Sequence, residues 1–112
     1  MSERPLIDVK EPKSISLTQE TQFAPNGIVS RTLVRTERVR VVLFGFSAGQ
    51  ELTEHTSTYE ATVQILTGAC EFVLFGKTHQ MKAGDFLYMP PNAPHALKAT
   101  EQFSMLLTLY RP

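Results

Sequence analysis

Short runs of apolar residues that alternate with polar ones fill most of the chain from Ile28 onward. In the stretch VRVVLFGF, residues 39–46, the side chains of Val39, Val41 and Leu43 would lie on one face of an extended strand. The preceding stretch IVSRTLVRT, residues 28–36, is also rich in β-branched residues. Such residues favour strand over helix, so both stretches are predicted to be strands.

Turn signals separate the later runs at regular intervals. Each run is only a few residues long, and glycine or proline pairs stand between them. The runs are ATVQIL, CEFVLF, HQMK, DFLYM, HALKA and FSMLLTLY. Gly76 between two of them can supply the positive φ of a hairpin turn. With no sustained helical stripe, this pattern predicts a single all-β domain, a sandwich or barrel.

The two ends of the chain suggest how the domain is organised. Residues 1–36 are predicted to form an N-terminal arm and leading strand or strands, docked on the barrel or on a partner subunit, and residues 37–112 form the barrel. The run FSMLLTLY is apolar on both faces, and a sheet-to-sheet contact would cover its outer face. We therefore predict a homodimer.

Composition narrows the class of partner. The 112 residues include 11 basic and 11 acidic side chains, so no net charge favours nucleic acid or an anionic membrane. No apolar run approaches the ~20 residues of a membrane span. The charged N-terminus is unlike a signal peptide, and the single Cys70 is interpreted as a packing residue, which together indicate a cytoplasmic protein. The expected partner is a small organic molecule.

Two motifs carry the candidate chemistry. The stretch GDFLYMPPNAPHALKA, residues 84–99, spaces a glycine, a proline, an asparagine and a histidine at fixed intervals, and EHTSTYEATVQILTG lies upstream. The chain resembles the cupin family over about residues 39–110, because both family motifs are present in the correct order. The positions that match are Gly49, His55 and Gly68 in the first motif and Gly84, Pro90 and His95 in the second, with Asn92 in place of a glycine.

The resemblance implies a small jelly-roll barrel with both motif histidines pointing into one open end. In the family, three histidines and a glutamate typically hold a divalent ion. Here Ser57 stands in place of one histidine, Ala61 in place of the glutamate, and Ala99 in place of a terminal asparagine. The metal ligands that remain are His55 and His95.

Other side chains near this segment are candidates for completing the site. Gln64 or Tyr59 could add an oxygen, and Glu60 a carboxylate if residues 57–61 are bulged. A regular strand would place Ala61 with His55 and leave Gln64 on the opposite face. The predicted pocket residues are Ser57, Tyr59, Ala61, Gln64 and Met105. The sequence leaves open whether a divalent transition metal is bound or whether the two histidines bond to Ser57, Tyr59 or water.

Two functions are consistent with this pattern. The first is a small-molecule-binding, metal-dependent enzyme of the dioxygenase, isomerase or decarboxylase type, to which the resemblance points without selecting one or assigning a catalytic residue. The alternative is a non-catalytic module that binds or senses a small ligand or a metal. His79, which follows the predicted hairpin turn, is interpreted as a solvent-facing strand residue.

Overall fold

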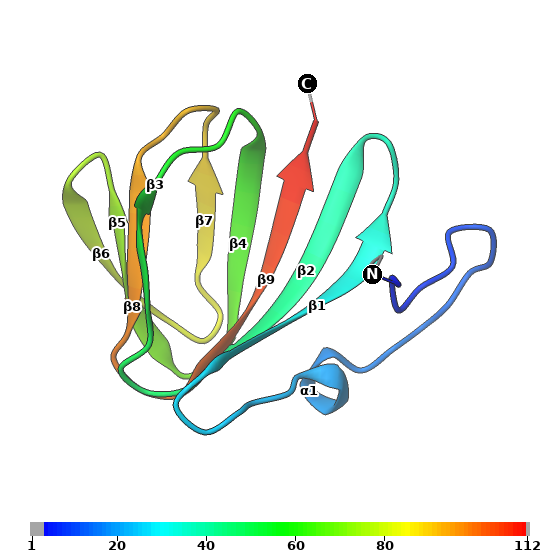
Figure 1. Cartoon of the computed structure of the whole chain (residues 1–112), viewed down its shortest axis with the longest axis horizontal. Helices are drawn as coiled ribbons and strands as arrows, with labels where there is room; N and C mark the ends of the chain where they lie inside the picture. Colours follow the sequence, from blue (N-terminus) through cyan, green and yellow to red (C-terminus); the bar gives the residue numbers. More distant parts are fainter. Residues whose placement is uncertain (1–3, 112) are drawn as a thin grey trace.

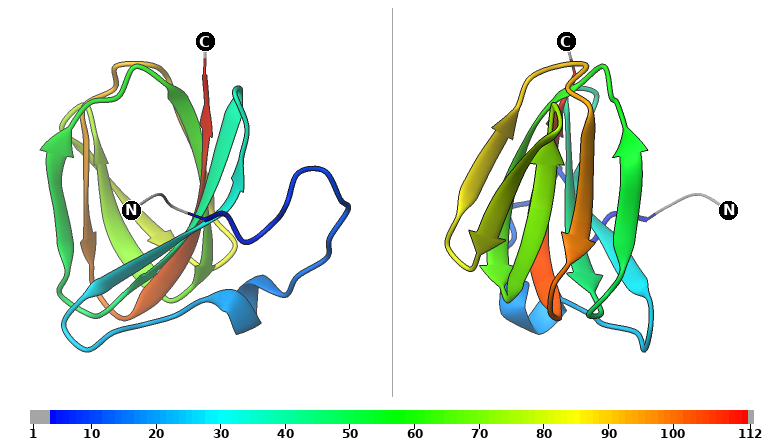
Figure 2. Two further views of the ribbon diagram at one scale, coloured as in Figure 1. Left: turned by 45° about the vertical axis from the view of Figure 1, so that its right-hand side comes forward. Right: turned by 90° about the vertical axis from the view of Figure 1, so that its left-hand side faces the viewer.

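A computed structural model describes residues 4–111, which form two β-sheets that face each other (Figures 1 and 2). The strands are β1 (Ile28–Arg35), β2 (Val39–Phe46), β3 (Glu51–His55), β4 (Glu60–Thr67), β5 (Ala69–Leu74), β6 (Lys77–Lys82), β7 (Phe86–Met89), β8 (His95–Ala99) and β9 (Phe103–Tyr110). One sheet has the order β1-β2-β9-β4-β7 and the other β3-β8-β5-β6, with antiparallel neighbours throughout. The predicted single all-β domain and its strands are confirmed.

The core lies between the sheets and is rich in phenylalanine. Phe46, Phe72 and Phe103 are its largest fully buried side chains, and the rings of Phe46 and Phe103 stack with centroids 4.6 Å apart. In Figure 1 the two sheets lie closest at the bottom and spread towards the top, where the C-terminus is. Phe46 and Phe103 pack where β2 ends and β9 begins, whereas Phe72 lies near the histidines, with its ring centroid 6.4 Å from that of His95.

Local backbone geometry follows the predicted turn residues. Phe75 and Gly76, at φ 50° and 76°, join β5 to β6, which confirms the hairpin. Asn92 has φ 66°, so it adopts the left-handed conformation for which glycine is usual. At Gly68 (φ 75°) a Cβ would lie 2.0 Å from the carbonyl oxygen of Gln102, so only glycine fits there.

The N-terminal arm docks on the outside of its own barrel. The backbone amides of Leu6 and Ile7 donate to carbonyls of β1, and the short helix α1 (Leu17–Glu20) is held by an ion pair between Glu20 and Arg31. At Gly45 of β2 a Cβ would lie 2.1 Å from the carbonyl oxygen of Gln22, so the arm packs directly on this strand. The two predicted segments, 1–36 and 37–112, share one sheet because β1 pairs with β2; residues 1–3 and 112 lie outside the described residues.

Helix α1 has four residues, and within residues 4–111 no helix is long and apolar enough to cross a membrane.

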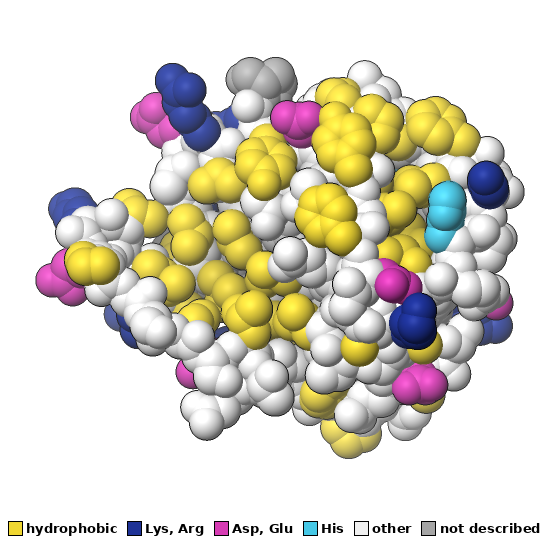
Figure 3. All heavy atoms as spheres, turned by 180° about the vertical axis from the view of Figure 1, so that it is seen from behind, with side chains coloured by type: hydrophobic (Ala, Val, Ile, Leu, Met, Phe, Trp, Pro, Cys, Tyr) yellow, Lys and Arg dark blue, Asp and Glu magenta, His cyan; other side chains and the backbone are white. Residues whose placement is uncertain are grey.

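The outer face of the five-stranded sheet carries exposed apolar side chains. Phe86 and Tyr88 on β7 are 60% and 51% exposed, and Tyr110 on β9 is 39% exposed. Figure 3, seen from behind, shows hydrophobic side chains gathered over much of this side of the molecule. FSMLLTLY is therefore apolar on both faces, as predicted, and its outer face is only partly covered.

Candidate functional site

The two motif histidines face each other across neighbouring strands. His55 ends β3, His95 begins β8, and the two residues are direct antiparallel partners. Their ring centroids are 4.1 Å apart, with 60° between the ring planes. His95 is half-buried and its ring also lies 6.4 Å from that of Phe72, whereas His55 is more exposed. The fold thus brings together the two histidines that the motifs singled out.

A backbone hydrogen bond fixes each imidazole in the same way. The Nδ1 atom of His55 lies 2.8 Å from the carbonyl oxygen of Thr53, and that of His95 lies 2.9 Å from the carbonyl oxygen of Ala93. A carbonyl oxygen only accepts, so each Nδ1 carries the proton. In the neutral ring Nε2 is then the atom with a free lone pair, and the two neighbouring rings each supply one such acceptor.

Two adjoining hollows meet at the histidines. The inner one, about 130 Å³, is almost wholly apolar. The outer one, about 230 Å³, opens towards the barrel mouth and includes polar groups of Ser57 and Tyr59. The inner hollow is lined by Phe44, Leu52, His55, Val63, Phe72, Met89, His95, Ala96, Leu97, Met105 and Leu107. The outer one is lined by His55, Ser57, Tyr59, Ala61, Met89, Pro90, Ala93, His95, Leu107 and Leu109.

Ser57, Tyr59, Ala61 and Met105 line these hollows at the places where the sequence predicts pocket residues. A regular strand does not continue from His55 to Ala61, because residues 56–59 form a loop between the two sheets. The amide of Asn92 donates to the carbonyl oxygen of Ser57 at 2.7 Å, and the Ser57 hydroxyl accepts from the amide of Tyr59. The second motif therefore holds this loop in place.

Gln64 and Glu60 are not brought to the histidines. Both lie on the outer face of β4, whose inward residues are Ala61 and Val63, and no bulge reverses the strand before Ile65. Glu60 accepts a hydrogen bond of 2.7 Å from the hydroxyl of Tyr88, which raises the pKa of that tyrosine. The prediction that Gln64 belongs to the pocket is therefore wrong, and Glu60 is not placed to add a carboxylate.

Several lining residues were not predicted from the sequence. Leu107 and Leu109 share a face of β9 with Met105, so the alternation of FSMLLTLY already contained that signal. Leu52 and Met89 carried no such signal, because they reach the cavity only through the pairing of the strands. His79 is half-buried opposite Phe72 rather than solvent-facing, and it lines neither hollow.

Comparison with known proteins decides the family. The model of the cupin domain matches residues 42–109, more than half of the chain. This chain belongs to the cupin family. A conserved protein of unknown function from Streptococcus pyogenes is similar to it over 100% of this chain and 96% of its own, with 36% identity and a TM-score of 0.86. An uncharacterised protein of Aquifex aeolicus is 28% identical over 108 residues, 96% of this chain and 88% of its own length.

Cupins of known activity share the fold at lower identity. A point mutant of salicylate 1,2-dioxygenase from Pseudoaminobacter salicylatoxidans matches with 22% identity and a TM-score of 0.71. The match covers 75% of this chain but 26% of that enzyme. The similarity to this enzyme is one of fold.

The donor set of this cupin departs from the four ligands that the family motifs imply. Among residues 4–111, no three or more histidine, cysteine, aspartate or glutamate side chains are grouped so that they could hold a metal ion. Two imidazole Nε2 atoms remain, with the neutral oxygens of Ser57 and Tyr59 lining the same hollow. These residues fit an exchangeable divalent ion that takes its other ligands from solvent or from a bound molecule, and they do not fit a four-residue site.

Proposed function

We propose that this cupin binds a small organic molecule between its sheets, with a donor group of that molecule bonded to the Nε2 atoms of His55 and His95. One observation carries the proposal: both Nδ1 atoms donate to backbone carbonyls, so both acceptor atoms are fixed in advance beside an apolar cavity. Apolar walls with a few oriented polar groups are typical of ligand sites. A prepositioned acceptor also loses little side-chain freedom when a ligand binds.

The size of the cavity supports a small ligand. The two hollows, of about 130 and 230 Å³, are each smaller than the roughly 300–1,000 Å³ of common ligand pockets. The inner hollow offers almost only carbon to its contents, so the part of the ligand that enters it is apolar. A single aromatic or short aliphatic body with one polar group matches these two properties.

The same histidine geometry supports a metal-dependent enzyme as a second candidate. Histidines that ligate metals usually donate their other ring N–H to a carbonyl or carboxylate, as both do here. When bound, a divalent transition metal would act as a Lewis acid that polarises a carbonyl or enolate oxygen, which is common to dioxygenase, isomerase and decarboxylase chemistry. The chain itself supplies the two imidazoles and the apolar walls that exclude water.

A titration with phenol and anisole tests the first candidate. Both probes carry the same ring, but only phenol donates a hydrogen bond. We expect phenol to move the NMR signals of His55, His95 and Leu107, and to bind about 5-fold more tightly than anisole, as a net hydrogen bond of about 1 kcal/mol requires. His55→Ala and His95→Ala should remove the preference, and the control His79→Ala should keep it. Equal binding of the two probes, or no response of the cavity signals, would contradict the proposal.

Metal analysis tests the second candidate. Protein purified after growth with manganese, iron, cobalt or zinc should retain a transition metal that is lost in His55→Ala and His95→Ala but not in His79→Ala. Because two imidazoles bind weakly, we expect the metal to be removed by brief dialysis against a chelator. Metal-free protein under every supplement would exclude the metal-dependent enzyme and leave the binding function.

We also propose that the protein is a homodimer through the outer face of the five-stranded sheet. That face combines the exposed Phe86, Tyr88 and Tyr110 with neutral polar residues of β4 and β9, and its acidic side chain on β4, Glu60, accepts a hydrogen bond from Tyr88. Two copies related by a two-fold axis would therefore bury mostly uncharged side chains there. Figure 3 shows groups of hydrophobic side chains on this side of the molecule, with polar and acidic ones between them, and a second sheet would cover these groups.

A further inference from the structure

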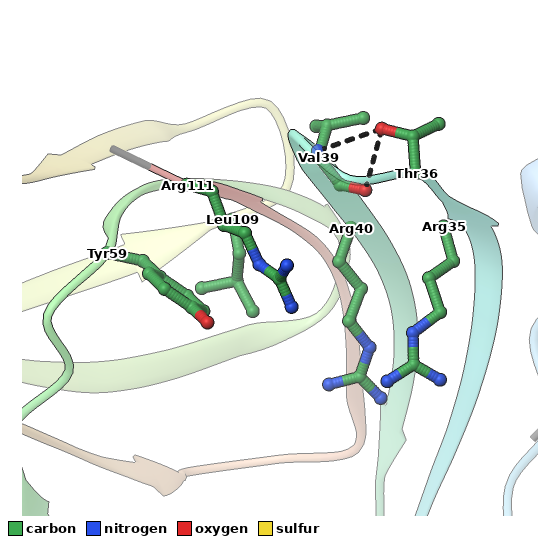
Figure 4. Close-up of a pocket in the computed structure, with 7 residues that line it drawn as sticks. All are labelled: Arg35, Thr36, Val39, Arg40, Tyr59, Leu109 and Arg111. Carbon is green, nitrogen blue, oxygen red and sulfur yellow. Dashed lines mark hydrogen bonds between the residues drawn. The ribbon is translucent and has the colours of Figure 1, made fainter.

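The side chain of Tyr59 stands between two hollows at the open end of the barrel. One is the outer histidine hollow of about 230 Å³, and the other, which we call the distal hollow, measures about 140 Å³. Figure 4 shows Tyr59 and Arg111 at one side of the distal hollow and Arg35 and Arg40 at the other. The distal hollow is lined by Arg35, Thr36, Val39, Arg40, Tyr59, Leu109 and Arg111. Tyr59 and Leu109 line both hollows, so they form the wall between them.

Of the two wall residues, Tyr59 is the one that comes from a loop. Leu109 lies within β9, where it pairs with Arg40 of β2 and with Ala61 of β4, so its side chain is part of the inner surface of the sheet. Tyr59 belongs to the loop of residues 56–59, directly before β4. The phenol ring of Tyr59 therefore divides a space that the sheet alone would leave continuous.

Contacts to both the backbone and the ring hold Tyr59 in place. Its amide donates to the hydroxyl of Ser57 at 3.2 Å, and the carbonyl oxygen of Ser57 accepts from the amide of Asn92 in the second motif. The guanidinium carbon of Arg111 lies 6.0 Å from the centre of the Tyr59 ring, within cation–π range. The amide of Arg111 itself donates to the carbonyl oxygen of Arg38 at 2.8 Å. The ring is therefore held between an anchored loop and an anchored cation.

The volumes of the hollows can be compared with the size of an aromatic ring. An apolar cavity of about 150 Å³ holds one benzene molecule. By this measure the inner hollow of about 130 Å³ holds about one ring, and the outer hollow of about 230 Å³ holds one ring with space to spare. Ala61, Leu107 and Leu109 give the outer hollow a largely apolar wall. The distal hollow, about 140 Å³, would accommodate about one more ring if Tyr59 did not separate it from the outer hollow.

We propose that Tyr59 determines the size of the ligand, because its ring ends the space available beyond the histidines. The proposal rests on the small-molecule function proposed above and adds the class of ligand: a molecule whose hydrogen-bond donor lies between two apolar groups. One group occupies the inner hollow, the other occupies the outer hollow, and the donor bonds to His55 or His95 where the two hollows meet. Replacing Tyr59 by alanine joins the outer hollow to the distal hollow and admits a longer molecule.

A titration with three matched probes tests the proposal on the full chain. The probes are N-methylaniline, N-benzylaniline and N-(biphenyl-4-ylmethyl)aniline, which share one N–H donor and carry one, two and three rings. Binding is followed by the NMR signals of His55 and Leu107. In the wild type we expect the second ring to raise the affinity by about 10-fold, as the burial of an aromatic group requires, and the third ring to add nothing. In Tyr59→Ala the third ring should add a further gain of about 10-fold.

Further variants attribute the effect to the ring of Tyr59. Tyr59→Phe keeps the ring, so it should exclude the third ring of the probe as the wild type does. Tyr59→Leu keeps a smaller apolar side chain and should admit the third ring with a gain of about 3-fold, which provides the test if Tyr59→Ala does not fold. Phe75→Ala removes an exposed aromatic ring at the β5–β6 turn, outside both hollows, and should leave the three affinities unchanged.

The outcomes separate this proposal from the small-molecule function. If the one-ring and two-ring probes move the signals of His55 and Leu107, but the third ring changes the affinity equally in the wild type and in Tyr59→Ala, the role of Tyr59 is overturned and the small-molecule function stands. If no probe moves those signals in the wild type, the small-molecule function fails and this proposal fails with it. A Tyr59→Phe variant that accepts the third ring would also overturn the role of the ring as the wall.

Discussion

Replacing Ala61 by glutamate should lower the stability of the metal-free protein and make its stability depend on a bound metal. Ala61 is buried on the inward face of β4 and lines the outer hollow with both histidines. A carboxyl group buried there without metal takes up a proton, and a neutral polar group that is buried without a hydrogen-bond partner costs about 1–3 kcal/mol. For a domain of this size each kcal/mol corresponds to roughly 4 °C in Tm, so Ala61→Glu should melt about 4–12 °C below wild type without metal.

Zinc should reverse that loss. With the new carboxylate next to two Nε2 acceptors, the variant has three protein ligands, and metal at 100 times its Kd would restore about 2.7 kcal/mol. Thermal unfolding followed by circular dichroism, with and without zinc, measures both effects. Ala61→Gln is the matched control: it should lose stability and gain little from zinc. The reasoning is refuted if Ala61→Glu is as stable as wild type without metal, or if the glutamine variant responds equally to zinc.

Three further predictions concern the rest of the molecule. Burial raises the pKa of the Cys70 thiol from about 9 to about 11. The stability that the protonated thiol contributes is therefore full below pH 9 and is lost, by about 3 kcal/mol, as the pH rises through 11. Urea unfolding of Cys70→Ala should lack this part of the pH dependence. Glu60→Gln should lower the pKa of Tyr88, read from tyrosinate absorbance, because the carboxylate bonded to its hydroxyl is the main cause of its rise; an unchanged titration would contradict the contact. Phe86→Glu should convert the dimer to a monomer in sedimentation, whereas Phe75→Glu, at the exposed hairpin turn, should not; a monomeric wild type would refute the dimer.

The strands and turns could be predicted because their signals are local. Alternation in VRVVLFGF and FSMLLTLY, and residues able to adopt positive φ at Gly76 and Asn92, depend only on neighbouring residues. The two histidines were found because the motif spacing fixes them. The cytoplasmic location, the homodimer and the metal stay predictions.

The rest of the site depended on contacts that no local pattern encodes. Gln64 was assigned to the pocket as an alternative because the phase of β4 cannot be read until the loop at residues 56–59 is known. Arg35, Arg40 and Arg111 look like ordinary charged residues in sequence, and only the register of β1, β2 and β9 gathers them at one mouth. Sequence periodicity shows which side chains share one face of a strand, but the pairing between strands determines which residues of other strands lie beside them.

The central claim, that His55 and His95 present two Nε2 acceptors to the cavity, is tested most directly by the tautomers of the two rings. Long-range nitrogen–proton NMR of the ligand-free protein in mildly alkaline buffer distinguishes a protonated Nδ1 from a protonated Nε2 in each neutral imidazole. The account predicts that both rings carry the proton on Nδ1, where the carbonyl oxygens of Thr53 and Ala93 accept it. A proton on Nε2 of either histidine would contradict it.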